Sequence, residues 1–305
     1  MKLYFLNLEN ITTKNLTDWH SCYSLIPFIN INSYKEIKKE NKDEICYENV
    51  YSTLFLNGSL KSHERVNNPE EADYFILPFK YNESLIKKFI PLAKAHNKKI
   101  VCFYFDDNAF PFYLDENVIL FRSSANKSSL HKNERILPYI APDQKYSNLI
   151  PEESIGFCGR TQHGREKLLE LIKKTNIPTN FIIREGYWNH WADNDLKLVN
   201  SRKEFNKNLT ESKYQFCYRG HGNFSYRFYE VLSFGRIPIL IDSDIQLPFS
   251  KIINWDEYAI IIKENEILNL PDILKSKKFS TDKNRKLWED YFSPIGYFEN
   301  FLNDI

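Results

Sequence analysis

The chain has 305 residues, of which 42% are hydrophobic and 15% aromatic, enough apolar material for one large or two medium folded domains. Its 41 lysines and arginines balance 40 aspartates and glutamates, which leaves a net charge of +1. This composition excludes global disorder, and it gives no support to nucleic-acid binding, which needs a basic field.

The cysteines show no pairing pattern. No CxxC pair occurs among Cys22, Cys46, Cys102, Cys158 and Cys217. Three of the five lie in apolar runs, where a reduced thiol behaves as a small hydrophobe. The N-terminus, MKLYFLNLEN, turns polar too soon for a signal peptide, and no apolar run reaches the roughly 18 residues of a membrane span. We therefore expect a cytoplasmic protein with reduced cysteines, in the host cytoplasm if the protein is viral.

Short apolar runs alternate with helix-like segments along the chain, which is the pattern of an α/β fold with parallel sheets. In the first half the strands are predicted at 3–7, 74–78, 100–105, 118–122 and 136–139, with a helix at 83–95. The segment 138–154 is polar and contains three prolines, which indicates an interdomain linker.

A second alternating series follows this linker. Strands are predicted at 155–158, 180–184, 214–218, 237–241 and 258–262, and helices at 165–174, near 201–211 and at 226–234. Two consecutive series predict two Rossmann-like domains facing a cleft, over residues 1–145 and 146–280. The last segment, 281–305, is expected to be helical and to pack back on the first domain.

The stretch 216–249, FCYRGHGNFSYRFYEVLSFGRIPILIDSDIQLPF, carries the clearest chemistry. Its strand delivers Arg219 at the carboxyl end, where α/β sheets place ligands, and Gly220 lets the backbone approach a bound group closely. Arg227 and Glu230 lie three residues apart in the next helix, whose N-terminus favours an anion. Guanidiniums on a diphosphate and a carboxylate on ribose hydroxyls fit this pattern. A solvated Arg219 beside a surface pair of Arg227 and Glu230 is the alternative.

The same stretch resembles the exostosin-like glycosyltransferases. The shared features, in chain order, are Arg219-Gly220, Ser225 with Arg227 and Glu230, Gly235 with Ile237-Pro238, Pro248-Phe249 and Trp255. A weaker resemblance extends to FCGRTQHGR at 157–165 and to EADYFILPF at 71–79. The match over 214–262 is specific, because several unlike residue types keep a fixed spacing.

The resemblance implies a GT-B fold and glycosyl transfer with inversion, from a nucleotide sugar, in the first place a UDP-sugar, to a glycan or other hydroxyl acceptor. The donor contacts that it implies are Gly159, Arg160, Arg219, Gly220, Ser225, Arg227 and Glu230. The arginines would neutralise the departing diphosphate, Ser225 would contact phosphate, and Glu230 would hold the ribose. Because these arginines and a helix N-terminus supply the charge, no metal cofactor is expected.

An inverting transferase also needs a general base for the acceptor hydroxyl. Asp106 and Asp107 follow the strand VCFYF on the ligand-binding side of the first domain, although a turn or a helix cap would also account for them. His63 and Glu64 form a second candidate pair. An aromatic cluster could stack on a sugar or a base, or belong to the core: Tyr187, Trp188, His190 and Trp191.

Asp242-Ser243-Asp244 matches the Asp-x-Asp motif with which GT-A transferases hold a divalent metal on the donor diphosphate. Because the motif follows a strand of the second series, we expect a turn there. A metal-dependent GT-A transferase using Asp242 and Asp244 is one alternative function. A non-catalytic module that binds a nucleotide sugar or a glycan is the other.

Overall fold

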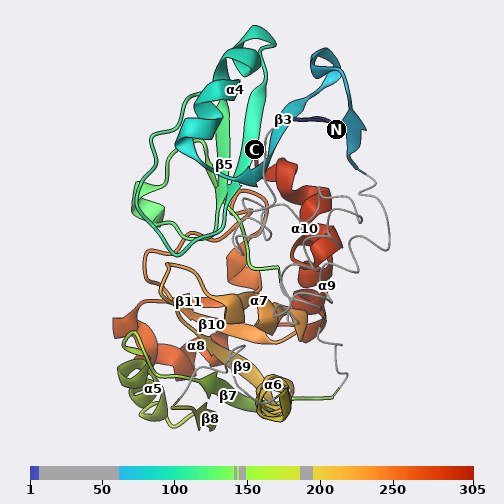
Figure 1. Cartoon of the computed structure of the whole chain (residues 1–305). Helices are drawn as coiled ribbons and strands as arrows, with labels where there is room; N and C mark the ends of the chain where they lie inside the picture. The colour runs from blue at the N-terminus through green and yellow to red at the C-terminus, as the bar shows by residue number, and fades with distance from the viewer. Residues whose placement is uncertain (7–61, 141–142, 144–148, 186–194) are drawn as a thin grey trace. The chain divides into compact units, whose positions relative to one another are not determined.

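Figure 1 shows the computed structural model of the chain, which describes residues 1–6, 62–140, 143, 149–185 and 195–305. Two compact units are formed, the first from Met1–Pro138, Asp244–Phe249 and Tyr297–Ile305, the second from Tyr139–Ser243 and Ser250–Gly296. The chain therefore changes unit after Pro138 and not after residue 145. The predicted last segment, 281–305, is divided as well, because only Tyr297–Ile305 belongs to the first unit.

The first unit is built on a six-stranded sheet in which all neighbouring strands are parallel. The strands are β1 (Lys2–Phe5), β2 (Glu64–Val66), β3 (Tyr74–Lys80), β4 (Lys99–Tyr104), β5 (Val118–Arg122) and β6 (Glu134–Ile136). They lie in the order β2-β1-β3-β4-β5-β6. The middle strands β4 and β5 are almost wholly buried, as expected for a parallel sheet covered on both faces.

Helix α4 (Glu83–Ala95) connects β3 to β4. Its start is fixed by Asn82, whose side-chain oxygen accepts a hydrogen bond from Leu85 N at 3.0 Å, the bond of an N-cap. Ile86 and Ala93 lie on its buried side and join the apolar core formed with the strands.

The end of the chain contributes aromatic rings to the first unit. Helix α10 (Pro294–Asn300) leads into the 3-10 helix η8 (Phe301–Asp304). The fully buried ring of Phe301 lies 5.9 Å from the ring of Phe103 and 5.5 Å from that of Phe121. The C-terminal residues thus pack on β4 and β5.

The second unit has a five-stranded sheet, again with parallel neighbours throughout. Its strands are β7 (Glu152–Gly159), β8 (Thr179–Ile183), β9 (Ser212–Cys217), β10 (Ile237–Ile241) and β11 (Ile260–Ile262). Its helices are α5 (Arg165–Lys173), α6 (Asp195–Glu211), α7 (Tyr226–Ser233), α8 (Leu270–Ser276) and α9 (Thr281–Tyr291). The strand order is β11-β10-β9-β7-β8.

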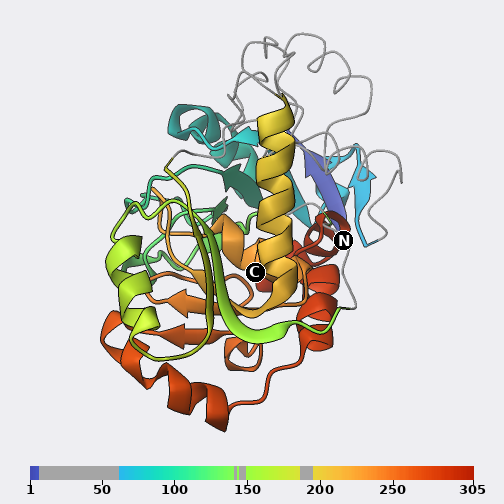
Figure 2. The same ribbon diagram turned by 90° about the horizontal axis from the view of Figure 1, so that it is seen from below.

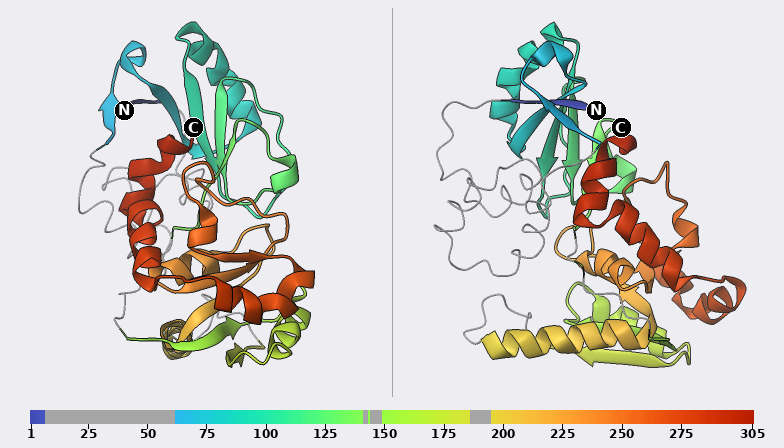
Figure 3. Two further views of the ribbon diagram at one scale, coloured as in Figure 1. Left: turned by 180° about the vertical axis from the view of Figure 1, so that it is seen from behind. Right: turned by 90° about the vertical axis from the view of Figure 1, so that its right-hand side faces the viewer.

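Helices cover both faces of this second sheet. Because side chains alternate along a strand, Tyr214 and Phe216 of β9 face one core, shared with α5 and α8, whereas Gln215 faces the other side. There Gln215 Nε2 donates to the backbone oxygen of Asn208 in α6 at 3.0 Å. Helix α6 runs alongside β7, as the right panel of Figure 3 and the view in Figure 2 both show.

Both sheets are doubly wound in the same order. Starting from the first strand of each unit, the chain adds one strand on one side and then all the others on the opposite side. The direction reverses between β1 and β3 in the first unit and between β7 and β9 in the second. The prediction of two Rossmann-like domains is therefore confirmed. Open α/β sheets bind ligands outside the carboxyl ends of the strands at this switch point.

Several elements differ from the predictions. Strand β2 and helix α8 were not predicted, and strands β6 and β7 begin two and three residues earlier than predicted. Helix α6 begins at Asp195, and the last strand begins at Ile260, after a short 3-10 helix at Trp255–Glu257. No helix in the described part of the chain combines the length and the apolar character that a membrane span needs.

Candidate functional site

The predicted donor residues gather at the switch point of the second unit. β7 and β9 are neighbours in the sheet, with Ile155 paired to Tyr214. β7 ends at Gly159, so Arg160 follows at its carboxyl end, and Arg219 follows the end of β9 in the same way. Both arginines are half-buried. The sheet itself thus brings together two residues that are far apart in the sequence.

Arg165, the first residue of α5, joins these two loops. Its Nη2 donates to the backbone oxygen of Arg219 at 2.6 Å, and its Nη1 donates to the backbone oxygen of Arg160 at 3.4 Å. Arg219 in turn folds over its own loop, with Nη2 donating to His221 O at 3.0 Å. The sequence analysis placed Arg165 at a helix start but did not assign it to the site. Its position at the end of FCGRTQHGR was the available signal.

Arg227 lies beneath the turn that ends β7. Its Nη2 donates to Cys158 O at 2.5 Å, and its guanidinium stacks on Phe157, with 4.2 Å between Cζ and the ring centroid. Burial lowers the pKa of Arg227, but a guanidinium stays charged near neutral pH. The buried Nε has no hydrogen-bond partner among the residues that the structure describes. Arg227 is therefore a fixed positive charge within the site.

Glu230 is buried, with 6% of its surface exposed, and it pairs with a cation that the sequence analysis did not identify. Arg202 of α6 reaches Glu230 Oε1 with its Nη1 at 3.0 Å. The alternative of a surface pair between Arg227 and Glu230 is therefore wrong. A carboxylate has about four acceptor positions, so this contact leaves room for hydroxyl donors.

Ser225 immediately precedes α7, with an extended backbone at φ −134° and ψ 115°. Its side chain makes no capping hydrogen bond to the helix. Asn223 binds the residue after Asp242: its Nδ2 donates to Ser243 O at 3.1 Å and its Oδ1 accepts from Ser243 Oγ at 2.7 Å. The loop is thus tied to the residues that follow β10. The unpaired N–H groups in the first turn of a helix are groups that bind anions.

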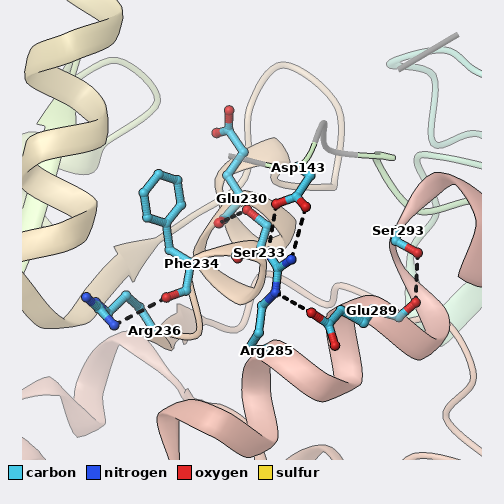
Figure 4. Close-up of polar contacts among 8 residues, drawn as sticks. All are labelled: Asp143, Glu230, Ser233, Phe234, Arg236, Arg285, Glu289 and Ser293. Atoms are coloured by element: carbon cyan, nitrogen blue, oxygen red, sulfur yellow. Dashed lines mark hydrogen bonds and ion pairs between the residues drawn. The ribbon is translucent and has the colours of Figure 1, made fainter. Parts of the chain in front are cut away.

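The opposite end of α7 is held by two guanidiniums, of which that of Arg236 is buried and that of Arg285 is partly buried (Figure 4). Arg285 of α9 donates from Nη1 to Ser233 O at 2.7 Å, and Arg236 donates from Nη1 to Phe234 O at 3.2 Å. Arg285 is itself paired with Asp143, at 2.9 Å. Cations at a helix C-terminus stabilise the carbonyl dipoles there. Helix α7 is thus fixed at its C-terminal end, which helps to hold Arg227 of its first turn in place.

In the first unit, Asp106 and Asp107 lie just past the carboxyl end of β4, as predicted. Asp106 forms a turn: its Oδ1 accepts from Asn108 N at 3.0 Å, and its backbone N donates to Ser123 Oγ at 3.0 Å. Asp106 thus has the structural role in a turn that was the alternative to a general base. Asp107, the next residue in that turn, is exposed to solvent.

The second candidate pair lies elsewhere in the first unit. His63 Nε2 lies 2.7 Å from Phe298 O, and the His63 ring packs edge-on against Phe301. Burial lowers the pKa of His63. Glu64 opens the short strand β2. The aromatic cluster at 187–191 lies outside the described residues.

Asp242 and Asp244 belong to different units. The backbone N of Asp242 donates to Ile262 O at 2.8 Å, so Asp242 ends β10. Asp244 has a left-handed backbone, with φ 63°, and its carboxylate accepts from Ser128 N at 3.2 Å and from Ser128 Oγ at 2.5 Å. The motif therefore forms a turn at which the chain changes unit.

A doubly wound α/β unit with guanidiniums and a helix N-terminus at its switch point has the features that suit a bound phosphate group. Residues 134–277 match the family model of the exostosin GT47 domain. The chain is 22% identical to the exostosin-1 homolog of Caenorhabditis elegans, covering 88% of this chain and 80% of that one. These similarities support an exostosin-like glycosyltransferase.

Plant proteins show the same similarity. A probable glucuronosyltransferase of Oryza sativa is 22% identical over 77% of this chain, and a probable glycosyltransferase of Arabidopsis thaliana is 29% identical over 76%. The alignments cover 66% of the rice protein and 55% of the Arabidopsis protein. The chain thus spans less than two thirds of the length of these plant relatives.

Proposed function

We propose that the protein transfers a sugar from a nucleotide-sugar donor, of the UDP class, to a hydroxyl group of a glycan, with inversion at the anomeric carbon. The observation that carries the proposal is the set of guanidiniums at the switch point between β7 and β9. Arg160 and Arg219 follow these strands, and Arg227 lies beneath them at the start of α7. A diphosphate is the ligand that such a set fits.

The main requirement of the reaction is to stabilise the negative charge of the leaving diphosphate. As the bond between the anomeric carbon and the diphosphate breaks, negative charge grows on the departing phosphate oxygens. Arg219 and Arg227, with the N-terminus of α7, would stabilise that charge without reorganising, because their positions are fixed by Arg165 and by Cys158 O. Glu230 would accept from the ribose hydroxyls. Gly159 and Gly220 would let the backbone approach the phosphates.

The acceptor hydroxyl must lose its proton as its oxygen bonds to the anomeric carbon. We assign that proton to the carboxylate of Asp107, which is exposed on a turn fixed by Asp106 and Ser123. The new bond forms on the face opposite the leaving diphosphate, so a base separate from the donor site is required for inversion.

Transfer is proposed to need no divalent metal, because the charge of the diphosphate is met by the guanidiniums. The carboxylate of Asp244 is engaged by Ser128, which argues against a joint role with Asp242 as a metal clamp.

A donor assay in excess EDTA tests the proposal. UDP-sugars are incubated with the full chain and a mixed glycan pool, and proton NMR follows release of the sugar and the configuration of its new bond. We expect turnover of one donor class and a product of inverted configuration. Retained configuration would contradict the inverting mechanism, and activity that requires added manganese would favour the metal-dependent alternative. Nucleotide binding without any turnover would favour the non-catalytic binding module.

A further inference from the structure

The loop between β4 and β5 carries two solvent-exposed aromatic side chains. Phe110 is 77% exposed and Tyr113 is 101% exposed, and both lie in the segment that starts with Asp106 and Asp107. Single exposed apolar residues are ordinary, but two large aromatic side chains within four residues of one loop need an explanation.

This loop is held firmly by a buried ion pair. Arg122 and Glu134 are each 1% exposed, and they meet with 2.8 Å between Nη1 and Oε1. The same guanidinium donates to Phe110 O at 2.8 Å and to Asn108 O at 2.5 Å. The backbone on both sides of Ala109 is therefore bonded to a buried charge on β5. A buried charge that keeps such bonds fixes the loop in one conformation.

The loop also has its own apolar anchor. Phe112 points inward, where its ring lies 5.3 Å from that of Tyr81 and 5.0 Å from that of Tyr104, and Arg122 Cζ lies 4.6 Å from its centroid. One aromatic ring of the loop is thus packed while the rings of Phe110 and Tyr113 are not. The loop is anchored by the ring of Phe112, and the exposed rings of Phe110 and Tyr113 do not contribute to that anchor.

We propose that Phe110 and Tyr113 form an acceptor subsite, on which a sugar ring of the glycan acceptor lies against the aromatic faces beside Asp107. A pyranose ring presents an apolar C–H face and polar hydroxyl edges, which matches aromatic rings in a loop that also carries carboxylates. Asp107 lies three positions before Phe110 in the same fixed loop, so the proposed base and the proposed subsite belong to one short segment of the chain. This inference rests on the proposed function, for which it names the acceptor-binding residues.

A glycan fits this loop better than a protein partner does. Protein interfaces need a contiguous apolar core of several side chains. Here the two rings are separated by Pro111 and the inward Phe112, and the polar groups of Asp106, Asp107 and Asn108 precede them. Separated rings with nearby hydrogen-bond acceptors suit a ligand that is itself apolar on its faces and polar at its edges.

The test compares three forms of the full chain on an array of xylo-, cello-, chito- and glycosaminoglycan oligosaccharides. They are the wild type, the Phe110→Ala/Tyr113→Ala double variant, and a control, Leu268→Ala, which removes a 56% exposed side chain from the second unit. We expect the wild type and the control to retain the same glycans, and the double variant to bind them at least roughly tenfold more weakly. Phe110→Trp/Tyr113→Trp should keep the binding.

Titration of UDP into the same proteins separates this inference from the proposed function. The double variant should bind UDP as the wild type does. The subsite is overturned if the double variant binds glycans as the wild type does, or if the wild type retains no glycan. In either case UDP binding still tests the proposed function. Glycan binding that depends on these rings in a chain that does not bind UDP would support the subsite and contradict the proposed function.

Discussion

Arg227 of α7 is packed directly against Gly159 at the end of β7: a methyl group on Gly159 would lie 2.8 Å from the Nη2 atom of the guanidinium. The two residues come from elements that only the sheet brings together, and both were predicted donor contacts. A methyl group cannot lie this close to a nitrogen atom. A side chain at position 159 must therefore displace the guanidinium of Arg227.

Gly159→Ala should therefore weaken nucleotide binding roughly tenfold, or about 1.4 kcal/mol. It should also lower the free energy of unfolding, because the buried guanidinium must move and because Gly159 has a positive φ of 159°. Gly156→Ala is a matched control in the same strand, where the added methyl would lie 2.4 Å from the buried Gln215 Nε2. We expect that control to lower the free energy of unfolding but to leave the affinity of the folded protein for UDP unchanged. Calorimetry and urea unfolding of both variants check the pair. Equal affinities in the two variants would mean that Arg227 does not contact the nucleotide.

Substitutions of Glu230 and of Arg202 should affect different quantities, UDP affinity in the first case and the free energy of unfolding in the second. Glu230→Ala is expected to weaken UDP binding by about 1.5–3 kcal/mol, the range for a hydrogen bond to a charged group. Arg202→Ala leaves a buried carboxylate without its partner and should mainly lower the free energy of unfolding. The measurements are calorimetric titration and denaturant unfolding. If Arg202→Ala weakens UDP binding as much as Glu230→Ala does, Glu230 serves the fold and not the ribose.

Much of the fold could be predicted because its signals are local. Strand β10 is the apolar run at 237–241, and helix α4 begins behind the N-cap of Asn82, so both bounds agree with the sequence prediction. Strand β2 has only three residues, ERV, and its sequence offers no apolar run to detect. Chain order alone does not show where a strand is inserted in a sheet, so the strand order could not be predicted.

The candidate site was predictable in part for the same reason. The positions of Arg219 and Arg227 at a strand end and a helix start could be predicted because strand ends and helix starts can be read from the sequence. Arg165 and Arg202 were missed because each acts on a residue more than 25 positions away, through contacts that no local pattern encodes. Such contacts depend on the order of strands in the sheet, which sequence periodicity does not fix.

Asp107→Asn should bind the donor nearly as the wild type does but turn over at least roughly 100-fold more slowly, as expected when a general base is lost. Asp106→Asn is the companion variant, because its amide oxygen can still accept from Asn108 N and so keep the turn. Steady-state rates with UDP affinities measured in parallel distinguish the two. Near-normal turnover of Asp107→Asn would move the role of base to Asp106 or to another residue.

The stability of the protein should depend on pH through His63. Burial lowers the pKa of His63 from its ordinary value of 6.5, so the unfolded chain binds the proton more readily than the folded chain. The stability that neutral His63 contributes is present above pH 6.5 and is lost as the pH falls from 6.5 toward the lower folded pKa. Urea unfolding at several pH values should show a smaller loss for His63→Gln than for the wild type. A pH dependence identical in the two proteins would contradict this assignment.

The central claim, that the switch point of the second unit binds a nucleoside diphosphate, is tested most directly by titrating UDP into the wild type and into Arg219→Ala/Arg227→Ala. Lys167→Ala removes an exposed lysine of α5 that pairs with Glu264, and it controls for a general loss of positive charge. Two charge-assisted contacts of about 1.5–3 kcal/mol each predict a loss of at least roughly 100-fold in affinity for the double variant. We expect one UDP bound per wild-type chain and per control chain. A wild type that does not bind UDP, or a double variant that binds it equally well, would contradict the claim.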